Sequence, residues 1–118
     1  MALPARRKRE TADTGRQKRA RCPAHLSFIR SHECSIPGCK GMPIEVAHVR
    51  TGTDGGTGLK PSDNWTISLC RDHHQEQHAI GEPAFEARHR ISMRGLAQEF
   101  AAASPAWRRH LQKTEAQR

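Results

Sequence analysis

The chain has 118 residues and a formal net charge of +8, from 20 Lys and Arg against 12 Asp and Glu. Only 35% of its residues are hydrophobic and 4% aromatic, so it can form one small domain with a modest core. No apolar leader segment opens it, and no apolar run approaches the roughly 20 residues of a membrane helix. These features predict a cytoplasmic protein without a membrane partner, whose four cysteines bind metal rather than form disulfides.

Most of the charge lies in the first 21 residues. They hold eight Lys or Arg and two acids, which is +6 of the total +8. Because residues 1–21 offer almost nothing to bury, we expect a disordered basic arm. Such arms bind polyanions by counterion release, and the predicted nucleic-acid contacts are Arg6, Arg7, Lys8 and Arg9. A solvated tail that only aids solubility is the alternative.

The remaining chain predicts an α+β fold. In chain order we expect a helix over 22–32, a turn carrying two thiols, a strand over 44–49, a glycine-rich loop, a strand over 65–69, a helix over 70–80 and a helical tail. Residues 22–81 would form the domain and residues 82–118 a C-terminal extension of two or three short helices. The expected core contacts of this extension are Phe85, Ile91, Leu96, Phe100 and Trp107.

Two short motifs predict a structural zinc site. Cys34 and Cys39 are separated by four residues, and Cys70 and His73 by two. Either spacing lets both side chains reach one ion, and two such pairs make a common tetrahedral zinc set. A domain this poor in apolar residues gains stability from such a clasp. Buried thiols without metal are the alternative, and Cys22 is either free or displaces one of the four.

The helix after Cys70 carries a second cluster. His74 and His78 lie four residues apart, so on a helix they share a face and can bind one ion. His73 points elsewhere, since each residue advances a helix by about 100°. We therefore expect two metal sites. A single site built on Cys70, His74 and His78 is the competing geometry.

Over residues 31–81 this order of motifs resembles the HNH endonucleases, also called ββα-metal or His-Me finger nucleases, in particular those of phages and prophages. The matching pieces are C-x4-C, "EVAHV", the glycine-rich loop, "SDNW" and "LCRDHH". The resemblance implies a small ββα-metal finger with a zinc knuckle, flanked by helices.

The resemblance also implies catalytic roles. His48 matches the general base, and His74 and His78 match ligands of a catalytic divalent ion. Asn64 or its neighbour Asp63 would orient His48. The residue before the base is usually a metal ligand, but here it is Ala47, which leaves Asp63, Asp54 or water as the third ligand.

The expected function is therefore metal-dependent hydrolysis of DNA phosphodiester bonds, with RNA as the other substrate. The cofactors would be a structural Zn²⁺ and a catalytic Mg²⁺, Mn²⁺, Ni²⁺ or Zn²⁺. Arg50, two residues past His48 on the same strand face, is a candidate phosphate contact. The rival hypothesis is a zinc-stabilised nucleic-acid-binding module without catalysis. The oligomeric state stays open.

Overall fold

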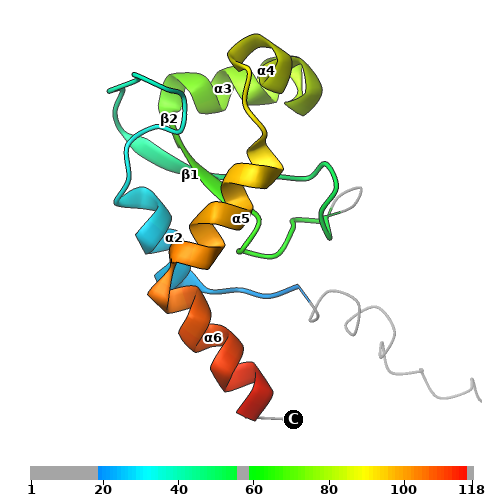
Figure 1. The fold of residues 1–118 in the computed structure, drawn as a ribbon. Coiled ribbons are helices and arrows are strands. Elements are labelled where there is room, and N and C mark those ends of the chain that lie inside the picture. Colours follow the sequence, from blue (N-terminus) through cyan, green and yellow to red (C-terminus); the bar gives the residue numbers. More distant parts are fainter. Residues whose placement is uncertain (1–18, 56–58, 117–118) are drawn as a thin grey trace, which may run out of the picture.

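A computed structural model describes residues 19–55 and 59–116. The predicted phosphate contacts Arg6, Arg7, Lys8 and Arg9 lie outside these residues. Figure 1 shows the described elements, which in chain order are α2 (Pro23–Arg30), β1 (Ile44–His48), β2 (Thr66–Cys70), α3 (Arg71–Ile80), α4 (Glu82–His89), α5 (Met93–Ala103) and α6 (Pro105–Ala116). The predicted α+β class and the predicted order of elements are confirmed.

The sheet consists of β1 and β2, paired antiparallel so that Ile44 lies opposite Cys70 and His48 opposite Thr66. All five residues of β2 are buried. The strand begins and ends one residue later than the sequence predicted. This register brings the end of β1, with His48, to the start of β2, and the end of β2 to the first turn of α3.

Local signals set the helix ends. Pro23 opens α2, where its missing N–H leaves no bond unmade. The Cys70 sulfur accepts a hydrogen bond from the His73 amide and caps α3, and Gly81 ends that helix with a φ of 87° that favours glycine. The Ser92 hydroxyl accepts from the Gly95 amide and caps α5. The tail, as far as residue 116, contains three helices.

One hydrophobic core joins the sheet to the helical tail. Ile67 and Leu69 of β2 pack in one cluster with Phe85 of α4 and with Met93 and Ala97 of α5. Among the predicted tail contacts, Phe85 and Trp107 are buried. The other three lie partly buried against the cluster: Ile91, Leu96 and Phe100. Helices α4 and α5 therefore contribute to the same core as the sheet.

The segment before α2 is attached to the loop before β2. The Ala20 amide donates to the Ser62 hydroxyl at 2.9 Å, and the Asp63 amide donates to the Ala20 carbonyl at 3.0 Å. The Arg21 guanidinium donates to the carbonyl oxygens of Pro61 at 2.6 Å and Lys60 at 3.1 Å. Ala20 and Arg21, which the sequence assigned to a disordered arm, are therefore held in place, because the loop supplies partners that the sequence pattern does not reveal.

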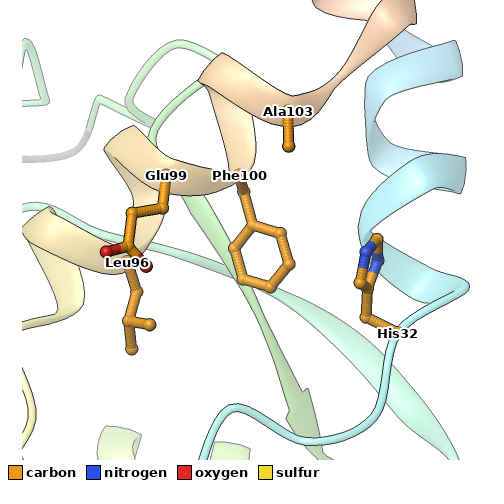
Figure 2. A pocket seen from close by; sticks show the side chains of 5 residues that line it. All are labelled: His32, Leu96, Glu99, Phe100 and Ala103. Atoms are coloured by element: carbon orange, nitrogen blue, oxygen red, sulfur yellow. The ribbon is translucent and has the colours of Figure 1, made fainter.

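A hollow of about 220 Å³ lies between α5 and the residues after α2. In Figure 2, the Phe100 ring projects from α5 toward the His32 ring, with Leu96 and Ala103 on the same helix. The two rings meet edge to face at 5.0 Å between centroids. This hollow is mainly apolar and shares no residue with the sites described below.

No helix of the described residues is long and apolar enough to cross a membrane.

Candidate functional site

Three cysteines and one histidine converge between the turn before β1 and the start of α3. The His73 Nδ1 lies 3.4 Å from the Cys34 sulfur, 3.5 Å from that of Cys39 and 3.3 Å from that of Cys70. The sulfurs of Cys39 and Cys70 are 3.9 Å apart. A tetrahedral Zn²⁺ with ordinary bond lengths holds its ligand atoms about 3.5–3.8 Å from one another. The four predicted zinc ligands therefore form a Cys3His group that fits a metal ion such as zinc.

The backbone around this group leaves room for the sulfurs. A Cβ atom on Gly41 would lie 2.9 Å from the Cys70 sulfur and 3.4 Å from that of Cys39. The Gly41 amide also donates to the Cys39 sulfur at 3.4 Å. Glycine is therefore required at position 41 by the close approach of the chain to two ligands, a constraint that the sequence analysis did not identify.

The thiols differ in their acidity. Burial raises the pKa of Cys34 to about 11, whereas the hydrogen bond from the Gly41 amide lowers the pKa of Cys39 below its usual value. Zinc binds the thiolate, so binding by Cys34 must displace a proton that burial alone would retain. The Cys3His group is thus a pH-dependent metal ligand set.

Cys22 does not displace one of the four ligands, and the Cys3His group does not merge with His74 and His78. The Cys22 sulfur is buried beside the Ala106 carbonyl, at 3.9 Å, and lies outside the Cys3His group. Cys70 joins Cys34, Cys39 and His73 in that group, and His74 and His78 do not belong to it. Consecutive residues on α3 therefore contribute to separate clusters.

The second cluster contains a carboxylate that the sequence analysis missed. The His74 Nδ1 lies 2.8 Å from Glu45 Oε1, and the Nε2 atoms of His74 and His78 are 3.2 Å apart. Two imidazole nitrogens on one Zn²⁺-like ion lie between about 2.9 and 3.4 Å apart. This separation is compatible with a hydrogen bond between the two rings as well as with two ligands of one ion, and Glu45 is bonded to the other nitrogen of His74.

The strand pattern places Glu45 on a face of β1 but does not reveal His74 as its partner. Glu45 lies two residues before Ala47, so both lie on the same face of β1. Asp63 and Asp54, which the sequence offered as the third metal ligand, bind other groups. Asp63 contacts His48, and the Asp54 carboxylate accepts from the Ser62 amide at 2.9 Å and from its hydroxyl. Of these three carboxylates, Glu45 is the one bonded to His74.

His48, which is half-buried, pairs with the buried Asp63. The His48 Nε2 lies 3.1 Å from Asp63 Oδ1, and the Asp63 side chain is 2% exposed. Oδ2 of Asp63 accepts from the Cys22 amide at 2.7 Å. Asn64, the other candidate for orienting His48, makes no hydrogen bond to it in the described part of the chain. Asp63 is therefore the residue that fixes the His48 ring.

Opposing effects act on the pKa of His48. Burial lowers it below the ordinary histidine value, the hydrogen bond to Asp63 raises it, and the charge of Lys60 lowers it again. The net direction is downward. His48 is therefore neutral at neutral pH, with the proton on the nitrogen that faces Asp63 and a lone pair on Nδ1.

His48 and His78 line the same hollow. It has a volume of about 310 Å³, and Arg50 and Glu82 also lie on its wall. Both carboxylate oxygens of Glu82 accept backbone amides, from Arg50 and Thr51, at 2.8 Å. These bonds tie the start of α4 to the chain after β1. A neutral histidine, a second histidine beside His74 and a guanidinium thus surround one open space.

Comparison with known proteins gives a family but no described activity. No curated protein and no solved structure matches the chain. One protein family, described as "Protein of unknown function (DUF968)", matches residues 13–104. The match covers well over half of the chain, so the chain belongs to the DUF968 family. The matched residues include the Cys3His group, the His74–His78 pair and the His48–Asp63 pair.

Proposed function

We propose that this chain is a metal-dependent endonuclease of the HNH, or ββα-metal, type that hydrolyses phosphodiester bonds in DNA and is held together by a structural zinc ion. One observation carries the proposal. His48 and His78 line a single hollow, while Asp63 is bonded to His48 and Glu45 to His74. A zinc-stabilised fold alone needs neither of these histidine–carboxylate pairs.

In this proposal His48 is the general base. The Nε2–H donates to the Asp63 carboxylate, which leaves the lone pair of Nδ1 free to accept a proton from an attacking water molecule. Asp63 keeps the ring in that tautomer and stabilises the imidazolium that forms. The lowered pKa of His48 keeps the base unprotonated at neutral pH. Such a positioned base contributes about 10²–10⁴-fold to a rate.

His74 and His78 are the proposed ligands of the catalytic ion, bound through the two Nε2 atoms that face one another. A bound divalent ion supplies positive charge to the scissile phosphate and to the departing oxygen. Glu45 accepts the Nδ1–H of His74, which directs the lone pair of Nε2 toward the ion. The imidazole ligands favour Zn²⁺, Ni²⁺ or Mn²⁺. Mg²⁺ prefers oxygen ligands, and Glu45 places a carboxylate near the same site.

A plasmid-nicking assay tests the proposal. The full chain, loaded with zinc, is incubated with supercoiled plasmid and Mn²⁺, Mg²⁺ or Ni²⁺, and nicked product is measured. We expect nicking by the natural chain and a loss of about 10²–10⁴-fold in His48→Ala, because the general base is removed. DNA affinity and zinc content should not change.

His32→Ala is the matched control for this assay. His32 lies after α2, where its Nδ1 bonds the Phe28 carbonyl, and it does not line the His48 hollow. This variant should nick DNA at the natural rate. Undiminished nicking by His48→Ala would refute the assignment of the base.

One observation favours the rival function, a zinc-stabilised nucleic-acid-binding module without catalysis. Within residues 19–55 and 59–116, the Cys3His group alone brings together three or more potential ligand atoms. Ala47, where the resembled nucleases carry a metal ligand, is fully buried in the core. If the natural chain binds DNA but cuts it with none of the three ions, this second function is the correct one.

A further inference from the structure

A second hollow, of about 200 Å³, lies where α6 packs beside the beginning of α2. Figure 1 shows α6 running past the segment that enters α2. The residues that line the hollow include Arg21, Arg109, His110 and Lys113, and none of the lining residues is acidic. Two of its lining residues, Arg21 and Cys22, contact Asp63, and the hollow lies outside both proposed metal sites.

The basic side chains form one row on α6. Ala106, Arg109, His110 and Lys113 follow the spacing of a single helix face. Ala106 and Trp107 are buried and fix the helix against its neighbours. The Trp107 ring also stacks on His110, at 4.8 Å between centroids and 18° between planes. The row is therefore held in place by packing at its N-terminal end.

Arg109 and Lys113 have unused charge. Both side chains are exposed, and neither forms a salt bridge with any residue in the described part of the chain. The acid nearest in sequence, Glu115, follows Lys113 by two residues and so points to another side of α6. An anion entering this hollow would thus meet cations that no carboxylate already neutralises.

Arg21 connects this hollow to the proposed catalytic pair. Its guanidinium donates to the carbonyls of Lys60 and Pro61 and lies 3.5 Å from Asp63 Oδ1. Asp63 in turn contacts His48. Arg21 is the last residue of the basic segment 1–21, which carries most of the net charge. Arg21 therefore lies between the His48–Asp63 pair, where it forms an ion pair with Asp63, and the basic residues of α6, whose hollow it also lines.

We infer that the hollow between α2 and α6 binds the sugar–phosphate backbone of the nucleic acid on one side of the cleaved bond. Arg109 and Lys113 are separated by about 6 Å along the helix axis, so each can contact its own phosphate in a row. Consecutive phosphates can contact both cations at once, whereas one small anion would contact them less completely. The inference rests on the proposed function, because it assigns a second contact to the same substrate.

Salt-dependent DNA binding tests this inference. The full zinc-loaded chain carrying His48→Ala, which binds without cutting, is titrated into a labelled 20-base-pair duplex at several salt concentrations, and fluorescence anisotropy gives Kd. Each lost phosphate contact lowers the slope of log affinity against log salt by about 0.9. We expect Arg109→Gln with Lys113→Gln to lower this slope by about 1.8 and to weaken binding roughly tenfold or more at 150 mM salt.

Arg108→Gln is the matched control. Arg108 lies on the same helix and is exposed, but its guanidinium donates to the Ala102 carbonyl and it does not line the hollow. This variant should keep the natural slope. An equal loss in Arg108→Gln, or an unchanged slope in the double variant, would overturn the inference.

Inorganic phosphate distinguishes a single-anion site from a backbone site. Added at constant ionic strength, it should compete weakly with the duplex. Strong competition that disappears in the double variant, with DNA affinity unchanged, would identify a free-phosphate site and contradict the inference. The binding assay requires no cleavage, so a negative result in it contradicts this inference and leaves the nuclease proposal standing. A chain that binds DNA through this hollow but never cuts it contradicts only the nuclease proposal.

Discussion

Two clusters on one helix differ in how completely the protein surrounds them. On one side of α3, His73 meets three sulfurs, so four protein ligands can fill a tetrahedral shell. Next to it, His74 and His78 face one another with a single carboxylate behind His74. Structural zinc sites are closed by four protein ligands, whereas catalytic sites keep positions open for water or substrate. Within α3, His73 therefore belongs to a group that could close around an ion, whereas His74 and His78 would leave positions open on the ion we propose there.

The difference follows from where each ligand comes from. The ligands of the Cys3His group come from the turn before β1, from the end of β2 and from α3, so an ion there joins three segments of the fold. The second cluster joins α3 only to β1, through Glu45. Loss of an ion should therefore affect folding at the first cluster and activity at the second.

The largest expected effect is loss of the closed site. Cys34→Ser should abolish zinc binding and leave the chain largely unfolded, because an ion in such a site contributes about 10–16 kcal/mol of apparent binding free energy that this small core cannot replace. Mass spectrometry of the native protein measures the bound zinc, and circular dichroism measures the helix content.

Cys22→Ser is the control for this prediction. Cys22 is also a buried thiol but lies outside the Cys3His group. The variant should keep one equivalent of zinc and a cooperative thermal transition. A fully folded, zinc-free Cys34→Ser protein would show that the site is not structural.

A smaller effect is expected at the open site. Glu45→Gln should raise the concentration of catalytic ion needed for half-maximal nicking by about 10–100-fold, the usual result of removing a carboxylate that orients a ligating histidine. Its zinc content and thermal stability should match those of the natural chain. Titration of nicking activity with Mn²⁺ measures the change, and an equal loss of structural zinc would mean that the two clusters are not independent.

Next in size is a shift in the pH dependence of nicking. Asp63 raises the pKa of His48 through its hydrogen bond, although burial is the larger effect and holds that pKa below the ordinary histidine value. Asp63→Asn removes the negative charge and should lower the pKa of His48 further. Because the base acts unprotonated, the acid limb of the pH–rate profile should move to lower pH. A shift to higher pH would contradict the role given to Asp63.

The smallest effect is expected at Lys60, an exposed residue whose charge lowers the pKa of His48. Lys60→Gln should raise that pKa and move the acid limb of the same profile to higher pH, opposite to Asp63→Asn. Salt screens exposed charges, so the shift should shrink as ionic strength rises. A salt-independent shift would indicate that Lys60 acts through a direct contact instead.

The sequence by itself determined the order of the elements and the two ligand pairs of the closed site. Cys34 with Cys39 and Cys70 with His73 are short-range pairs, and short spacing lets both members of a pair reach one ion. That the two pairs meet depends on the fold, because they lie more than 30 residues apart. The helical position of His74 and His78, four residues apart, was equally local. Proline, glycine and serine fixed the helix ends for the same reason, because each acts on the backbone within a few residues.

Only the tertiary structure decided which carboxylate joins each histidine. Glu45 and His74 are 29 residues apart and His48 and Asp63 are 15 apart, so their pairing depends on strand register and on the path of the glycine-rich loop. The order of residues left Asp63 and Asn64 equivalent, and only packing against Cys22 and His48 buried the first. The row of charge joining Arg21 to α6 likewise arises from contacts between segments nearly 90 residues apart, which no local pattern encodes.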